Sequence, residues 1–144
     1  QLERRWYLGW WRMRQQNWAI ALQNQISEFN EKPFAWGTHD CFTFAADCVL
    51  AMTGEDKMAK RRGKYKTELG ANKMLKRIGG VEKAITSELG EPIEPAYAKR
   101  GDVVYFNSPL GDTAGICMGS KIASPSATSV GFTPMSKAIK AWSV

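Results

Sequence analysis

The feature that most constrains this chain is the run from Cys41 to Met52, where ten of twelve residues are apolar. Only Thr43 and Asp47 interrupt the run, and they lie four residues apart on one stripe of a helix. A helix that is apolar nearly all round is buried in the core of a protein. We therefore predict a buried central helix here, with Asp40 as its N-cap, because an aspartate side chain accepts hydrogen bonds from the first free amides of a helix.

The three cysteines are expected to have different roles. Cys41 lies in the first turn of the predicted helix, where the helix dipole favours a thiolate and lowers the thiol pKa, whereas burial raises it. Cys41 is therefore a candidate nucleophile, and the alternative is a small buried hydrophobe. Cys48 and Cys117 are predicted core residues. Cys41 and Cys48 would lie about 10 Å apart along one helix, too far for a disulfide, which suits synthesis in a reducing cytoplasm.

Composition predicts one ordinary globular domain. The chain has 144 residues, of which 44% are hydrophobic and 24% charged, and this length can bury a core. It contains no run of 18 apolar residues and no recognisable signal peptide, so we expect no transmembrane segment. We expect no cofactor, and the spacing of His39, Cys41 and Asp47 matches no known metal site.

Basic residues are concentrated in one segment. The net charge is +6, and the segment 55–83 holds ten of the twenty Lys and Arg residues against four acids. A nucleic acid or an anionic wall polymer is one candidate partner for such a segment. We favour a solvated basic face instead, because no aromatic-rich nucleic-acid-binding motif accompanies the charges.

The N-terminal segment 1–17 is rich in tryptophan and arginine. Trp6, Trp10 and Met13 share one helical stripe, with Trp11 beside it. Helices at membrane interfaces have this composition, as do arms that dock on a neighbouring subunit, and the tryptophans could also belong to the domain's own core. We favour a protein-docking arm followed by a single domain at 18–144.

The order of expected elements indicates an α+β domain. We predict a helix at 17–30, the central helix, and a basic helical insert at 55–90 with short helices at 55–62, 67–78 and 81–89. Strands are predicted at 103–106, 113–118, 121–123 and 130–133, then a helical turn at 136–140 and a last strand at Trp142. Helices followed by short strands favour an antiparallel sheet.

Three stretches carry a resemblance to a known family. The stretch PFAWGTHDCFTFAAD, from Pro33 to Asp47, resembles the P-Y-x-W-G and D-C-S-G-F segments of NlpC-type papain-like cell-wall peptidases. The predicted strand after Gly101 is similar to their G-D-x-V-x-F strand. The segment 63–80 and the His-Asp-Cys signature are similar to small phage-encoded relatives found among tail genes. The resemblance implies a papain-like fold, with Cys41 as nucleophile at the start of a central helix packed on an antiparallel sheet.

The chain departs from that family at the expected base. The family's histidine begins the second strand, where this sequence has Thr113, and threonine cannot act as a base near neutral pH. The family's tyrosine in P-Y-x-W-G is Phe34 here. The only histidine is His39, so the predicted catalytic set is Cys41, His39 and Asp40, with His39 either the base or a packing residue of the turn. We expect Cys41 to be partly buried and weakly reactive.

The resemblance implies a function in a virion. We expect a tail-tip or tail-hub protein of peptidase-like fold, made in the host cytoplasm, that has the character of a degenerate peptidoglycan hydrolase acting in assembly or cell entry. Its expected partners are other tail proteins, through the arm, with peptidoglycan as a further candidate and nucleic acid not favoured. The alternative is an active cysteine peptidase or amidase that cleaves peptidoglycan peptides with Cys41.

Overall fold

The buried helix predicted from the apolar run is α2 (Cys41–Thr53) in the computed structural model, which describes residues 14–109, 111–126 and 128–144. Asp40 begins it with a capping box, in which its carboxylate accepts from the Thr43 amide while Thr43 Oγ1 accepts from the Asp40 amide. Gly54 ends it with a φ of 85°, the left-handed conformation that glycine adopts without strain. The predicted N-cap is confirmed.

The strands form one antiparallel sheet in the order β4-β3-β2-β1-β5. Their bounds are β1 Val103–Ser108, β2 Gly111–Cys117, β3 Lys121–Pro125, β4 Val130–Pro134 and β5 Ala138–Trp142. The short 3₁₀ helix Met135–Lys137 takes only part of the helical turn predicted at 136–140, since β5 begins at Ala138. The α+β class is confirmed.

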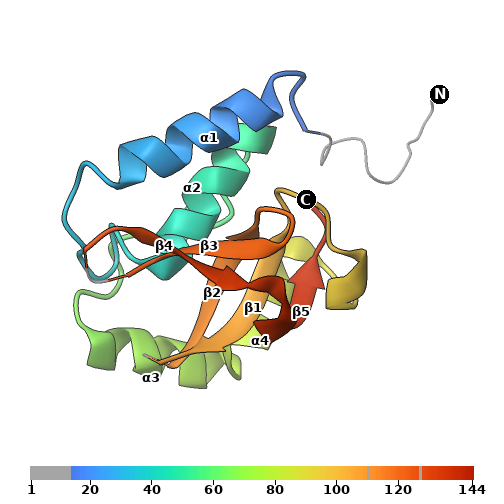
Figure 1. Ribbon diagram of the computed structural model, residues 1–144. Coiled ribbons are helices and arrows are strands. Elements are labelled where there is room, and N and C mark those ends of the chain that lie inside the picture. Colours follow the sequence, from blue (N-terminus) through green and yellow to red (C-terminus); the bar gives the residue numbers. More distant parts are fainter. Residues whose placement is uncertain (1–13, 110, 127) are drawn as a thin grey trace.

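The helices and the sheet form successive layers (Figure 1). Helix α1 (Trp18–Phe29) packs on α2, and α2 packs on one face of the sheet at β2 and β3. Alternation along β1 sends Val103 to the core beneath α2 and Val104 to the opposite face. The segment before β1 partly covers that opposite face, where Ile93 packs against Val104 and its neighbours. The sheet is therefore covered on one face by α2 and partly covered on the other.

The predicted basic helical insert contains two helices rather than three. Helix α3 (Glu68–Ile78) and helix α4 (Val81–Leu89) lie where they were predicted, but residues 57–63 form turns, so the short helix at 55–62 is wrong. The cause is local: Asp56 accepts hydrogen bonds from the Met58 amide and from the Arg62 guanidinium. These side-chain contacts compete with the helical backbone pattern.

Arg14, the first described residue, forms hydrogen bonds with the C-terminal residue Val144 and with Asp102. Its guanidinium donates to Asp102 Oδ1 at 2.9 Å, to the Val144 carbonyl at 2.8 Å and to the Arg100 carbonyl at 2.7 Å, and it lies over the Trp18 ring. Asp102 is fully buried, so Arg14 supplies its counter-charge. Residues 1–13 of the predicted arm lie outside the described part, and residues 14 and 15 are attached to the domain.

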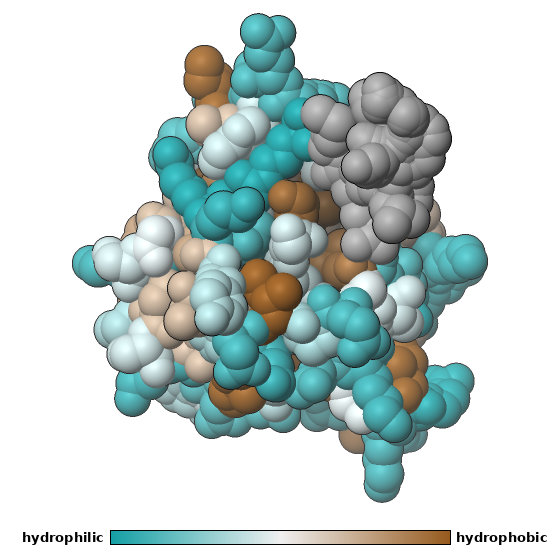
Figure 2. Space-filling model, turned by 90° about the vertical axis from the view of Figure 1, so that its right-hand side faces the viewer, coloured by the Kyte–Doolittle hydropathy of each residue, from teal (hydrophilic) through white to brown (hydrophobic). Residues whose placement is uncertain are grey.

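The described helices and one face of the surface (Figure 2) were compared with what a membrane-spanning segment requires. None of the described helices is both long and apolar enough to cross a bilayer. On the face shown in Figure 2, the coloured apolar residues form small patches separated by hydrophilic ones, rather than one continuous apolar area. Isolated apolar residues of this kind are ordinary on protein surfaces.

We predict that Arg14→Met lowers the free energy of unfolding by about 2–4 kcal/mol, because it leaves a buried carboxylate without its counter-charge. Urea unfolding measures the loss. The matched control is Arg100→Met, since Arg100 is exposed and its side chain has no ion pair with a described residue. Equal stability of the two variants would show that the Arg14–Asp102 contact does not stabilise the domain.

Candidate functional site

Cys41 lies in a cleft at the N-terminal end of α2. The cleft has a volume of about 330 Å³. It lies between the turn at 34–36, helix α3, the start of β2 and the end of β3. Phe34 and Trp36 form an aromatic wall, with ring centroids 5.0 Å apart in an edge-to-face arrangement. Cys41, the first residue of a buried helix, thus lines a cleft that solvent can reach, as a nucleophile requires.

The environment of the Cys41 sulfur keeps the thiol protonated. The pKa of Cys41 is raised to about 11, chiefly by burial and also by the Asp40 carboxylate beside it. Polar contacts with the Thr113 side chain and the Ala114 backbone lower the thiol pKa but are outweighed. Of the two effects expected from the sequence, burial is stronger than the helix N-terminus, so Cys41 carries very little thiolate at neutral pH.

Thr113 lies beside Cys41, at the position where the sequence resemblance expects a histidine. It belongs to β2, which runs alongside β1 with Thr113 opposite Phe106. Its side chain lies close enough to the sulfur to lower the thiol pKa, its hydroxyl oxygen is 3.4 Å from the Ala114 carbonyl oxygen, and its exposed fraction is 8%. A hydroxyl can donate to sulfur but cannot remove its proton near neutral pH. The cysteine therefore has a hydroxyl beside it in place of a base.

His39 contacts a different part of the domain. Its Nε2 donates to the Phe29 carbonyl oxygen at 2.7 Å, and its ring stacks on the Phe29 ring with centroids 3.6 Å apart and an interplanar angle of 10°. It lines a second cavity of about 260 Å³, whereas the described residues lining the Cys41 cleft do not include it. The structure therefore does not bring the imidazole of His39 and the sulfur of Cys41 into one cavity.

Asp40, the third predicted site residue, holds the local backbone in place. Its carboxylate is fully buried and accepts from the Gly37, Phe42 and Thr43 amides at 2.8–3.0 Å. The hydroxyl of Tyr65 donates a fourth hydrogen bond at 2.7 Å. Sequence analysis missed Tyr65, because no short-range pattern links residues that are 25 positions apart.

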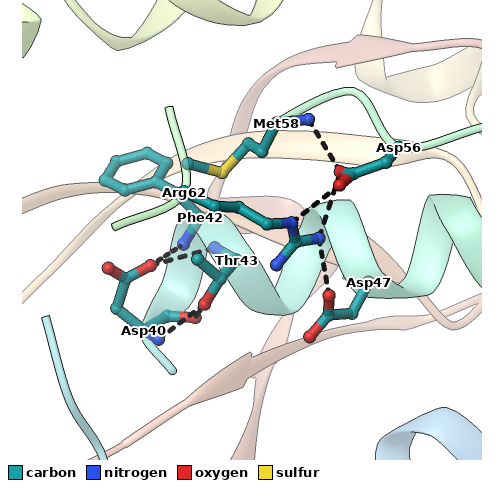
Figure 3. Close-up of polar contacts among 7 residues, drawn as sticks. All are labelled: Asp40, Phe42, Thr43, Asp47, Asp56, Met58 and Arg62. Carbon is teal, nitrogen blue, oxygen red and sulfur yellow. Dashed lines mark hydrogen bonds and ion pairs between the residues drawn. The ribbon is translucent and has the colours of Figure 1, made fainter. Parts of the chain in front are cut away.

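The predicted basic insert is partly neutralised by ion pairs. Arg62 bridges two carboxylates, with Asp47 Oδ1 at 2.6 Å and Asp56 Oδ2 at 2.9 Å (Figure 3). Burial raises the pKa of Asp47, and Arg62 partly offsets this. Burial alone would also raise the pKa of Asp56, but Arg62 and the Met58 amide hold its pKa below the ordinary value.

The neighbouring Arg61 pairs with Glu88 at 3.0 Å. Two adjacent basic residues of the predicted insert, Arg61 and Arg62, therefore have carboxylate partners within the chain.

Comparison with known proteins gives a family but no described activity. The family model for a domain of unknown function, DUF6950, matches residues 13–144. None of the curated proteins compared with the chain matches it. Among the described residues, no group of three His, Cys, Asp or Glu side chains could hold a metal ion.

We predict that Arg62→Met lowers the free energy of unfolding by about 1–2 kcal/mol at pH 7. We expect no larger loss because the Arg62, Asp47 and Asp56 side chains are about one quarter exposed, so solvent screens their ion pairs. The pKa of Asp56 is lowered in the folded protein, so the Arg62 contribution exists above the unfolded pKa and is lost as the pH falls below it. Urea unfolding should therefore show a smaller deficit at pH 3 than at pH 7. Lys60→Met is the matched control, and a deficit as large for Lys60→Met would contradict the assignment.

Proposed function

The chain belongs to the DUF6950 family, and we propose that it is a phage tail protein with an NlpC-type papain-like fold and no cysteine-peptidase activity. In this proposal it is a degenerate peptidoglycan hydrolase that takes part in tail assembly or cell entry. Cys41 keeps the position of the nucleophile, but its thiol stays protonated.

One observation carries the proposed loss of activity: the side chain of β2 that lies beside Cys41 in the cleft is Thr113, a hydroxyl and not an imidazole. A cysteine nucleophile needs a base within hydrogen-bond reach, normally an imidazole held by a third polar group. Thr113 occupies that place, and His39 Nε2 is bonded to the Phe29 carbonyl. Burial then sets the pKa of Cys41 at about 11, which leaves too little thiolate for attack on a peptide bond.

The papain-like part of the proposal is supported by how the site is built. A cysteine begins a buried helix, that helix packs on an antiparallel sheet, and the second strand of the sheet brings its first residues to the sulfur. This is the arrangement that the resemblance at Pro33–Asp47 implies. The tail assignment has separate support in the similarity of the segment 63–80 and of His39-Asp40-Cys41 to small phage tail-associated relatives.

An active cysteine peptidase is the second candidate, because the site has kept the space that a substrate needs. The Cys41 cleft measures about 330 Å³ and is lined by both aromatic and polar side chains. Such a mixture is typical of small-molecule and peptide sites. An active enzyme would still require a base other than Thr113.

The replacement Thr113→His tests the proposal directly. We predict that the wild-type protein does not cleave muropeptides and that iodoacetamide alkylates its Cys41 slowly at pH 7. An imidazole beside the sulfur should lower the thiol pKa and raise the alkylation rate about tenfold or more. Because the site is tight, circular dichroism should first establish that the variant folds.

Two controls keep the result interpretable. Thr113→Val removes the hydroxyl without adding a base, and it should make alkylation slower than in the wild type. His39→Ala should leave the alkylation rate of Cys41 unchanged, because His39 lines another cavity. Muropeptide cleavage by the wild-type protein, lost in Cys41→Ala, would overturn the proposal and establish the active-peptidase alternative.

A further inference from the structure

The Cys41 cleft and the cavity that His39 lines are neighbours on the surface of the domain. The two cavities, of about 330 Å³ and about 260 Å³, share three lining residues, Phe34, Pro125 and Ser126. Phe34 is 36% exposed, so its ring forms part of the surface between them. A ligand that lies across Phe34 can therefore occupy both cavities at once.

The two cavities have opposite electrostatic character. Among the described residues, Lys32 and His39 line the His39 cavity and no Asp or Glu does. Glu68 and Asp112 line the Cys41 cleft, and no Lys or Arg does. The cleft is thus locally acidic in a chain whose net charge is +6. A ligand that complements the whole groove carries a negative group at one end and a positive group at the other.

One charge at each end is available to a ligand. Neither Lys32 nor Glu68 forms an ion pair with another described residue, and both are exposed. In contrast, Asp112 already accepts a hydrogen bond from Asn107 Nδ2 at 2.7 Å. Lys32 and Glu68 are therefore the two charges that a bound ligand would pair with first.

The His39 cavity also contains groups that donate hydrogen bonds to an anion. Asn30 accepts from the Val130 amide through Oδ1 at 2.7 Å, which leaves its Nδ2 group as a donor. Thr128, which carries a hydroxyl group, lines the same cavity. A carboxylate accepts several such bonds together with an ammonium group. Between the two ends, Phe34 and Trp36 offer apolar contact to the middle of a chain.

We propose that this groove binds a short peptide-like chain, with its carboxylate in the His39 cavity near Lys32 and its ammonium group in the Cys41 cleft near Glu68. The inference rests on the proposed peptidase-like cleft and adds the class and direction of its ligand. Binding requires no reaction at Cys41. A protein that has lost hydrolysis can thus still recognise peptides.

Calorimetry with Cys41→Ala protein tests the proposal, because this variant separates binding from cleavage. The probes are tri-, tetra- and penta-alanine, each with free ends, with an acetylated N-terminus or with an amidated C-terminus. We expect one length with free ends to bind best, and each blocked end to weaken binding by about two- to fivefold, the value of one partly exposed ion pair.

Charge reversal at Lys32 and Glu68 then shows which end of the peptide each residue binds. Lys32→Glu should remove the preference for a free carboxylate but keep that for a free amine, and Glu68→Lys should do the reverse. Lys137→Glu and Glu91→Lys are matched controls at exposed residues outside both cavities, and both should keep the full preference. Circular dichroism establishes folding of all four variants.

Two results would overturn the inference: no binding of any alanine peptide at 10 mM, or equal binding of free and blocked peptides. Neither result bears on the proposed function, which the Thr113→His experiment tests through alkylation. Conversely, muropeptide cleavage by the wild type would overturn the loss of activity and leave the direction of binding intact. The two failures are thus distinguishable.

Discussion

The buried carboxylate of Asp40 is the contact on which the rest of the site depends. It joins three parts of the chain: the turn at Gly37, the first turn of α2, and Tyr65 in the segment before α3. Gly37 has a φ of 88°, and a Cβ there would lie 1.9 Å from the Tyr65 carbonyl oxygen, so the turn and this segment can meet only at a glycine. The four hydrogen bonds to Asp40 offset the cost of burying its charge.

The same arrangement that fixes the position of Cys41 also suppresses its reactivity. Burial and the Asp40 charge both raise the thiol pKa, and the polar contacts with β2 do not compensate. An imidazole on β2 would supply the missing positive charge when protonated and would take the thiol proton when neutral. Thr113 can do neither. The side chain at position 113 is therefore the difference from the resembled peptidases that matters most for the chemistry of Cys41.

Much of the fold was predictable from the sequence because its signals are local. The apolar run, the N-cap at Asp40 and the glycines after α2 and α3 predicted where helices begin and end. The site was predictable only in part. Cys41 and the substitution at Thr113 follow from the resemblance, whereas the contact of Tyr65 with Asp40 joins residues far apart in sequence. The turns at 57–63 lie in a segment predicted as helix, and the pairing of Arg62 with Asp47 depends on the tertiary structure.

The most direct test of the central claim is the titration of Cys41 itself. Protein labelled with ¹³C at cysteine Cβ gives one NMR signal per cysteine, and Cys48→Ala and Cys117→Ala variants assign the three signals. We predict that the Cys41 signal keeps its thiol position through pH 8 and shifts with a midpoint at a pH of about 11. A midpoint at or below pH 8 would show that another group stabilises the thiolate, and it would contradict the account of Cys41 as a buried, protonated remnant of a nucleophile.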